Sequence, residues 1–401
     1  MQRGKFGRDS ATPVEVRLFE EFLPIMFRFL HTADWQVGKQ FANIKGDAAA
    51  YLRNRRFETI EQIAAIATQQ KVDAVLVAGD VFETNIVNAK TIMQTFGAMG
   101  QFDGKWFLLP GNHDSAEPNS VWSRVKKTMS SENIVVLDHP EPYYLREHQV
   151  VILPAPLQRR HEARDLTKWF DDFNAEDGWI RIGLAHGSID NRLERGEAPN
   201  TISDTRAESA KLDYFALGDW HGTMNIAERT WYSGTPEPDR FKANDAGNVL
   251  LVEISEHGAK PSVEKISTGH YIWSEVEQQI FAEEDLNALE LSLLTPAVSP
   301  RRRLVRLSLS GTVSLETRLA IDQALERLSA ALFYIETDDT NLIAQPTGDD
   351  LDEIAQSGFV RTAINKLLAI ASDANSEDQD AAQRALQILY VQHKQLESGK
   401  C

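Results

Sequence analysis

The chain has 401 residues and an ordinary composition, with 42% hydrophobic and 25% charged residues, which excludes fibrous, collagen-like and fully disordered proteins. Its longest apolar runs are far shorter than the roughly 20 residues of a membrane span, so we expect no membrane association. The net charge of −17 disfavours tight, unassisted binding to polyanions, and the single cysteine, Cys401, excludes an intramolecular disulfide and favours a cytoplasmic location.

The first long segment has the pattern of a layered α/β domain. Residues 1–25 show no clean periodicity, and a strand pattern begins abruptly at Met26. We therefore expect an N-terminal extension over 1–25, with an ordinary helix over 14–23 as the alternative. From 26 to 270, short apolar runs alternate with helical spacing, which predicts a layered α/β domain of sheets and helices. The runs cover residues 27–30, 74–78, 106–109, 134–137, 150–153, 180–185, 214–217 and 249–254.

A smaller unit and a helical tail follow. Residues 271–340 predict a small α/β cap domain, because strand and helix patterns alternate there. The predicted strands are 272–280, 304–309 and 332–336, and the predicted helices are 285–293 and 315–328. A polar, acidic stretch begins near residue 338 and predicts a linker. Apolar residues then recur at helical spacing, so we assign 341–401 to an acidic linker and a helical tail.

Five of the apolar runs end in a cluster of polar residues that could bind a metal. In open α/β sheets, ligands bind beyond the carboxyl ends of the strands, so five such ends can converge on one site. Glycines in the clusters allow sharp turns that point the next side chain at the site. In chain order, the clusters are His31-Thr-Ala-Asp34-Trp-Gln36, Gly79-Asp80, Gly111-Asn112-His113-Asp114, His186-Gly187 and Gly218-Asp219-Trp220-His221.

The residue types in these clusters favour divalent metals. Carboxylate, imidazole and amide ligands without a thiolate suit Mn²⁺, Mg²⁺, Fe or Zn²⁺, and they argue against a structural zinc. A carboxylate such as that of Asp80 can bridge two cations. Two ions ~3.5–4 Å apart can clamp a phosphodiester, activate a water and stabilise the leaving oxygen. The pattern therefore points to metal-dependent hydrolysis of a phosphate ester.

The ordered set resembles the calcineurin-like metallophosphoesterase superfamily and, within it, the SbcD-type DNA repair exonuclease subunits. The resemblance covers about residues 26–270 and depends on Phe-Leu-His-Thr-Ala-Asp34-Trp, Ala-Gly-Asp80-Val-Phe, Leu-Pro-Gly-Asn112-His113-Asp114, Ala-His186-Gly and Leu-Gly-Asp219-Trp-His221. It implies a metallophosphoesterase β-sandwich flanked by helices, with the cap domain after it. It also implies a two-metal phosphodiesterase that acts on DNA as a nuclease, in repair or end processing.

The resemblance assigns roles to individual residues. One ion would be bound by Asp34, Gln36, Asp80 and His221. The second ion would be bound by Asp80, Asn112, His186 and Asp219. His113 would stabilise charge on the phosphate or protonate the leaving group, and Asp114 would orient it.

Two of these positions depart from the family pattern, because Gln36 and Asp219 each stand where a histidine ligand is usual. Glutamine offers a carbonyl oxygen and aspartate an anionic one. One interpretation is a site richer in oxygen that favours Mn²⁺, with Mg²⁺ or Fe as alternatives. The other is a weakened site in a non-catalytic role. We favour the first, because Asp80 and the other ligand and acid–base residues are all present.

The basic residues and the C-terminal helical tail suggest which partners the protein binds. Basic residues after two of the motifs, Arg53, Arg56, Lys126 and Lys127, are the candidate contacts to DNA phosphates. The apolar faces of the tail helices either pack on the cap domain or dock an SMC-type ATPase subunit, as the resemblance implies, and a homodimer is also compatible with the sequence. Two alternatives stay open: a phosphodiesterase that acts on nucleotides or other small molecules, and a catalytically weak scaffold subunit of an ATPase complex.

Overall fold

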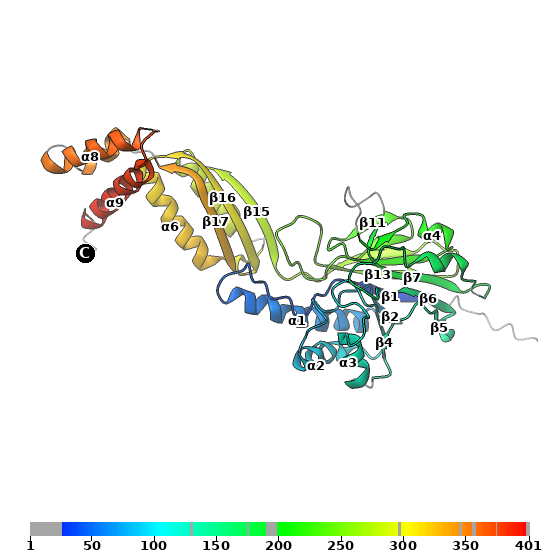
Figure 1. Cartoon of the computed structure of the whole chain (residues 1–401). Coiled ribbons are helices and arrows are strands. Elements are labelled where there is room, and N and C mark those ends of the chain that lie inside the picture. Colours follow the sequence, from blue (N-terminus) through cyan, green and yellow to red (C-terminus); the bar gives the residue numbers. More distant parts are fainter. Residues whose placement is uncertain are drawn as a thin grey trace, which may run out of the picture.

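The protein is elongated, with three regions along its length (Figure 1). This computed structural model describes residues 26–128, 131–174, 176–189, 199–295, 298–344, 347–354, 358–373 and 375–397. The predicted extension over 1–25, and its alternative helix, lie outside the described residues. A body of two large sheets is at one end, a curved three-stranded sheet lies in the middle, and the last helices are at the other end. None of the described helices is long and apolar enough to cross a membrane.

The first large sheet has six strands in the order β14-β13-β1-β2-β3-β4. Its central strand β1 pairs in parallel with β2 and antiparallel with β13, so that a late strand closes beside the first one. The strands are β1 (Phe27–Thr32), β2 (Ala74–Val77), β3 (Lys105–Leu108), β4 (Ile134–Val136), β13 (Asn248–Ile254) and β14 (Ser262–Ser267). The helices of this region are α1 (Ala48–Gln69), α2 (Ala89–Ala98) and α3 (Val121–Thr128), and their apolar residues pack on this sheet.

The second large sheet also has six strands, in the order β11-β12-β10-β7-β6-β5. Its strands are β5 (Tyr143–Leu145), β6 (Val150–Ala155), β7 (Ile180–His186), β10 (Tyr214–Gly218), β11 (Met224–Ala227) and β12 (Thr230–Tyr232). The short helix α4 (Arg206–Ser209) packs on its outer face. A separate two-stranded pair is formed by β8 (Ser188–Ile189) and β9 (Thr201–Ile202).

The two large sheets pack face to face and are covered by helices outside. Because strand side chains alternate between faces, Phe29 and Leu76 point into the space between the sheets, where they meet Ile182 of β7. Their neighbours, such as Val75, point the other way and pack against α1 and α2. The predicted α/β fold class, a β-sandwich flanked by helices, is confirmed.

The cap is a parallel sheet in the order β15-β16-β17, with strands β15 (Ile272–Gln279), β16 (Arg303–Val313) and β17 (Tyr334–Ala344). Helices α5 (Glu283–Leu294) and α6 (Leu315–Ala331) pack on it, and α7 (Gly348–Ile354), α8 (Gly358–Ala371) and α9 (Gln379–Glu397) form the tail. One prediction is wrong here: residues 338–344 are strand rather than linker. They continue β17 because β16 is long enough to pair with it as far as Val313 and Ala344.

Candidate metal centre

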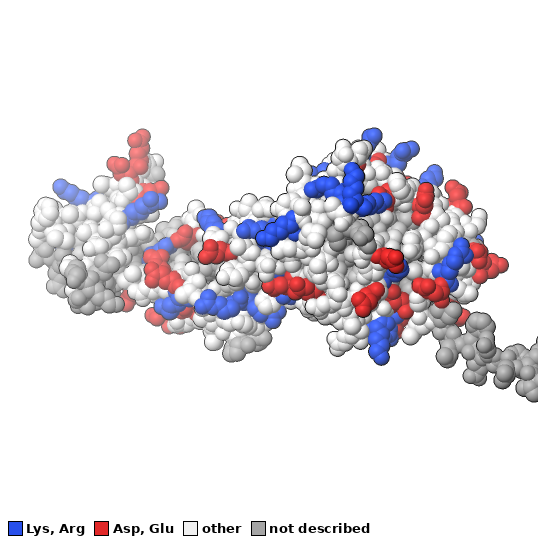
Figure 2. Space-filling model, turned by 90° about the horizontal axis from the view of Figure 1, so that it is seen from below, with Lys and Arg blue, Asp and Glu red and all other residues white. Residues whose placement is uncertain are grey.

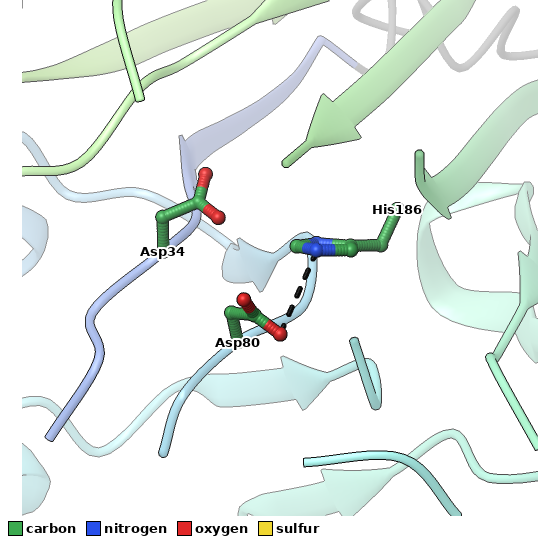
Figure 3. A group of neighbouring side chains, drawn as sticks. All are labelled: Asp34, Asp80 and His186. Atoms are coloured by element: carbon green, nitrogen blue, oxygen red, sulfur yellow. Dashed lines mark ion pairs between the residues drawn. The ribbon is translucent and has the colours of Figure 1, made fainter. Parts of the chain in front are cut away.

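Loops at the ends of β1, β2 and β7 bring three predicted ligands together. Asp34 and Asp80 follow β1 and β2, and His186 is the last residue of β7. Each offers one ligand atom, and these atoms lie within 4.8 Å of one another. Figure 3 shows the three side chains pointing toward one another, with an ion pair between His186 and Asp80. All three are buried, so this group can enclose a cation.

A second set of predicted ligands surrounds the His186 ring. Its Nδ1 atom donates to the Ala78 carbonyl at 2.8 Å, which leaves Nε2 facing the centre. Three oxygen atoms lie near Nε2: Asn112 Oδ1 at 3.3 Å, Asp80 Oδ1 at 3.6 Å and Asp219 Oδ1 at 3.7 Å. Oxygen and imidazole nitrogen atoms that converge in this way are the donor set of a divalent metal. The residues present therefore fit the ion that the sequence predicts.

The remaining predicted ligands, His221 and Gln36, contact Asp34 and Asp80 respectively. His221 Nε2 is 3.9 Å from Asp34 Oδ1, and His221 Nδ1 is 3.2 Å from Asp239 Oδ2. A carboxylate behind a histidine orients the ring so that its other nitrogen can bind a metal. Gln36 differs, because its amide nitrogen donates to Asp80 Oδ2 at 3.1 Å. Its amide must turn over before its oxygen can face a metal.

The backbone at this site is strained. Asp34, Gln36, Asp80 and Asp219 have φ angles of 54°, 48°, 55° and 99°, in the left-handed region that side chains rarely adopt. Such residues cost on the order of 1–3 kcal/mol each and persist where the surrounding structure enforces them. The loops also approach closely: a Cβ on Gly111 would lie 2.2 Å from Asp80 Oδ1. The glycine is therefore needed for the third motif to reach the second.

Charge in the cluster changes the proton affinity of its members. Burial raises the pKa of Asp34 to about 6, although His221 and His186 oppose this change. Burial alone would lower the pKa of His186, but nearby carboxylates, Asp80 first, outweigh it and raise the pKa to about 9. Without a metal, a proton on His186 therefore balances part of the negative charge. A divalent cation would take over that function.

His113 lies beside this cluster with a different orienting partner from the one predicted. Its Nδ1 contacts the main-chain carbonyl of Glu83 at 2.9 Å, and its main-chain nitrogen donates to Asp80 Oδ1 at 2.9 Å. Both carboxylate oxygens of Asp114 are used elsewhere, accepting from the main-chain nitrogens of Phe82 and Gly111. Asp114 therefore holds the two loops together. The prediction that it orients the His113 ring is wrong, because the Glu83 carbonyl does so instead.

The candidate phosphate contacts lie in different environments. Arg56 is only 3% exposed and donates to Thr235 and to the Glu237 carbonyl, so the prediction that it binds DNA is wrong. Arg53 donates to the Gln40 carbonyl, and Lys126 pairs with Asp138 at 2.6 Å. Lys127 is exposed. On the face shown in Figure 2, basic and acidic side chains are interspersed along the molecule.

Three residues near the site were missed by the sequence analysis: Lys39, Asp239 and Arg240. Lys39 Nζ lies 3.3 Å from Gln36 Oε1 and 2.8 Å from Asp239 Oδ2. Arg240 binds Asp239 through Nε and Nη2 and reaches His221 Nδ1 at 2.8 Å. Burial would raise the pKa of Asp239, but His221 and Arg240 hold it well below its usual range. Of these three residues, only Lys39 could have been suspected from the sequence, because it lies three residues after the predicted ligand Gln36.

Comparisons with known proteins identify a family and several distant relatives. The family model "Calcineurin-like phosphoesterase" matches residues 27–241, more than half of the chain. The SbcD subunit of the nuclease SbcCD from Escherichia coli (strain K12) is 24% identical over 281 residues, covering 60% of this chain and 68% of that protein. "DNA double-strand break repair protein Mre11" of Methanosarcina acetivorans is 21% identical over 261 residues, which is 61% of this chain and 40% of that protein.

Among solved structures, purple acid phosphatase PPD1 from yellow lupin (Lupinus luteus) seeds matches with a TM-score of 0.39 and 13% identity, over 61% of this chain and 52% of that chain. The family match covers all five predicted clusters. The resemblance predicted from the motifs is confirmed, and the chain belongs to the calcineurin-like phosphoesterase family.

Proposed function

We propose that this protein is a divalent-metal-dependent nuclease that hydrolyses phosphodiester bonds in DNA during repair or end processing. The observation that carries the proposal is the buried group of Asp34, Asp80 and His186, whose ligand atoms lie within 4.8 Å of one another. Family membership supports a hydrolase of phosphate esters. The names of two relatives, one a nuclease and the other a DNA double-strand break repair protein, support DNA as the substrate.

Two divalent ions fit the proposed chemistry, with Asp80 between them. The proposal assigns Asn112, His186 and Asp219 to one ion and Asp34 and His221 to the other, which is supported by the contacts of His186 with Asn112 and Asp219 and of His221 with Asp34. When bound, ions of this kind would supply polarisation of the phosphate and activation of a water molecule. The oxygen-rich donor set favours Mn²⁺, with Mg²⁺ or Fe as alternatives.

His113 is the proposed acid of the reaction. Because the Glu83 carbonyl accepts from Nδ1, the ring is held with Nε2 free to face a substrate. With a second proton on Nε2, the imidazolium ring can stabilise negative charge on the phosphate or give that proton to the leaving oxygen, while Nδ1 keeps its own proton for Glu83. The side chain is partly exposed, as a group that contacts substrate must be.

An SMC-type ATPase subunit is the proposed partner, and the exposed apolar residues of the tail support a docking function there. Phe359 of α8 is 88% exposed, and Ile388 and Leu396 of α9 are 62% and 66% exposed. An amphipathic helix that leaves such residues in water can bury them against a partner. A homodimer and a cytoplasmic location stay predictions.

A second candidate function is the hydrolysis of small phosphodiesters such as nucleotides. The interspersed charges on the face shown in Figure 2 favour it, because the described residues of that face do not form a single basic strip for a polyanion. The buried position of Arg56 removes one of the expected DNA contacts.

The test compares DNA and a small substrate with the same protein preparations. We expect Mn²⁺-dependent cleavage of single- or double-stranded DNA to be at least about tenfold faster than cleavage of bis-p-nitrophenyl phosphate at equal concentration. Asp80→Asn removes the central carboxylate and should reduce both rates by about 10³-fold or more, because it weakens both metal positions. Asp322→Asn, a change at a surface pair with Arg318 in the cap, is the matched control and should leave both rates unchanged.

The outcomes separate the candidates. A preference for the small diester would replace the DNA proposal with the second candidate. Full activity of Asp80→Asn on both substrates would mean that hydrolysis takes place elsewhere, and both candidates would be rejected.

A further inference from the structure

The two sides of Asp80 differ in what surrounds the ligand atoms. On the side of Asn112, His186 and Asp219, three oxygen atoms face a single imidazole nitrogen. Among the described residues, no hydrogen bond or ion pair of these three side chains involves a lysine or arginine. On the side of Gln36 and His221, two cationic side chains, Lys39 and Arg240, lie against the ligands. We call these the open side and the cationic side.

On the cationic side, a chain of polar contacts runs from Asp80 to His221. Gln36 donates to Asp80 Oδ2 at 3.1 Å, and Lys39 donates to Gln36 Oε1 at 3.3 Å. Lys39 also binds Asp239 Oδ2 at 2.8 Å, and the same oxygen lies 3.2 Å from His221 Nδ1. The Asp239 side chain is 1% exposed, so this contact anchors the ammonium group firmly beside the site.

Lys39 decides which way the Gln36 amide faces. An ammonium group only donates hydrogen bonds, and an ionised carboxylate only accepts them. With Lys39 on one side and Asp80 on the other, the amide oxygen must face Lys39 and the amide nitrogen must face Asp80. Turning the amide over would place its NH₂ group against the ammonium and its oxygen against the carboxylate. Gln36 is therefore held as a hydrogen-bond donor to Asp80 while Lys39 is present.

We propose that Lys39, acting through Gln36, makes the cationic side the weaker of two metal positions, so that the first ion binds on the open side. This inference rests on the metal dependence of the proposed function and changes the expected role of Gln36. An ion on the cationic side finds Asp34, Asp80 and His221 but no oxygen from Gln36. On the open side, all four predicted ligands lie with their oxygen or nitrogen atoms together.

The test is a Mn²⁺ titration of the chelator-treated full chain without substrate, followed by electron paramagnetic resonance of free Mn²⁺ and by calorimetry. We expect one tight position and a second that is at least about tenfold weaker. Lys39→Met frees the amide to turn and should tighten the second position about tenfold or more, with the first unchanged within about threefold. Lys39→Arg keeps a donor-only cation and should leave the second position weak. Lys260→Met, at an exposed lysine that pairs with Glu228, is the surface control and should resemble wild type.

Each outcome decides the proposal. Two positions of equal affinity in the wild type, or tightening by Lys39→Arg as large as by Lys39→Met, would overturn it. If Lys39→Met does not fold, Lys39→Gln removes the charge while keeping a polar partner for Asp239, and the same tightening is expected. Because no substrate is present, a chain with unequal positions that fails to cleave DNA would refute only the proposed function. An active chain with equal positions would refute only this inference.

Discussion

The sandwich and the C-terminal region bury different kinds of side chain. The sandwich buries carboxylates that include Asp34, Asp80 and Asp239. In the described part of 272–397, Asp350 is the one buried charged residue, and an ion pair such as Arg306 with Glu336 lies near the surface. Isolated buried charges are unfavourable unless they are paired or bind metals. The buried carboxylates of the sandwich therefore lower its stability in exchange for a site that can bind metal, whereas the cap and tail bury mainly apolar side chains.

The largest change in activity is expected from a substitution of His113 in the sandwich. His113→Ala should lower kcat on DNA by about 10²- to 10⁴-fold, because the leaving oxygen then lacks its proton donor. The loss should be smaller on bis-p-nitrophenyl phosphate, whose leaving group is stable without a proton. Metal content, measured by elemental analysis, should stay the same. His139→Ala, at a side chain that is 70% exposed, is the control. Equal losses on both substrates would remove the acid role from His113.

The next effect is a pH dependence of metal affinity. His186 must lose its proton to bind a metal, and its pKa is raised to about 9. Mn²⁺ affinity should therefore rise about tenfold per pH unit between pH 6.5 and 8.5. Calorimetry in buffers of different ionisation enthalpy should detect the released proton. An affinity that does not change over this interval would mean that His186 is already neutral in the metal-free chain.

The same shift has an effect on stability. Because the pKa of folded His186 lies above its ordinary value of 6.5, protonation stabilises the metal-free fold below that pH. This contribution, on the order of 3 kcal/mol, is lost as pH rises through about 9. Asp34 acts in the same direction, since its pKa is raised to about 6. The melting temperature of the metal-free chain should fall between pH 6.5 and 9, and His139→Gln should show the same fall as wild type.

The smallest effect on chemistry is expected in the tail. Leu386 is fully buried and Phe359 is 88% exposed. Leu386→Ala should destabilise the tail by about 2–5 kcal/mol, whereas Phe359→Ala should change its stability by less than about 0.5 kcal/mol. Neither should change the hydrolysis of a small diester. Thermal melting followed by circular dichroism, beside the same assay, checks both. A parallel loss of activity in Leu386→Ala would show that the two regions depend on each other.

What could be predicted from the sequence was local in nature. A ligand such as Asp80 is found because it directly follows an apolar strand, and strand ends in an α/β sheet share an edge. The fold class followed from the same alternation of strand and helix patterns. A buried strand such as β2 is a short run of apolar residues, and a run of this length is recognisable in the sequence.

What was missed depends on contacts between distant parts of the chain. Asp239 supports His221 and anchors Lys39, two hundred positions away, and no local pattern indicates such a partner. Arg56 follows a motif as a DNA contact would, yet its helix turns it inward to Glu237. The orientation of the Gln36 amide required knowledge of both neighbours. The full length of β17 was not predicted, because the polar residues Asp338 and Asp339 are typical of a linker and interrupt the apolar pattern of the strand.

The pairing of β1 with β13 has a consequence for the order in which the protein matures. Phe27 pairs with Ile254, so the strand that leads to Asp34 has one unpaired edge until translation has passed β13. Contacts between such distant residues form slowly, because a long loop must close first. His186 and His221 are also made late. A nascent chain that stops short of β13 therefore holds all the predicted ligands but has a bare strand edge beside β1 that is open to aggregation.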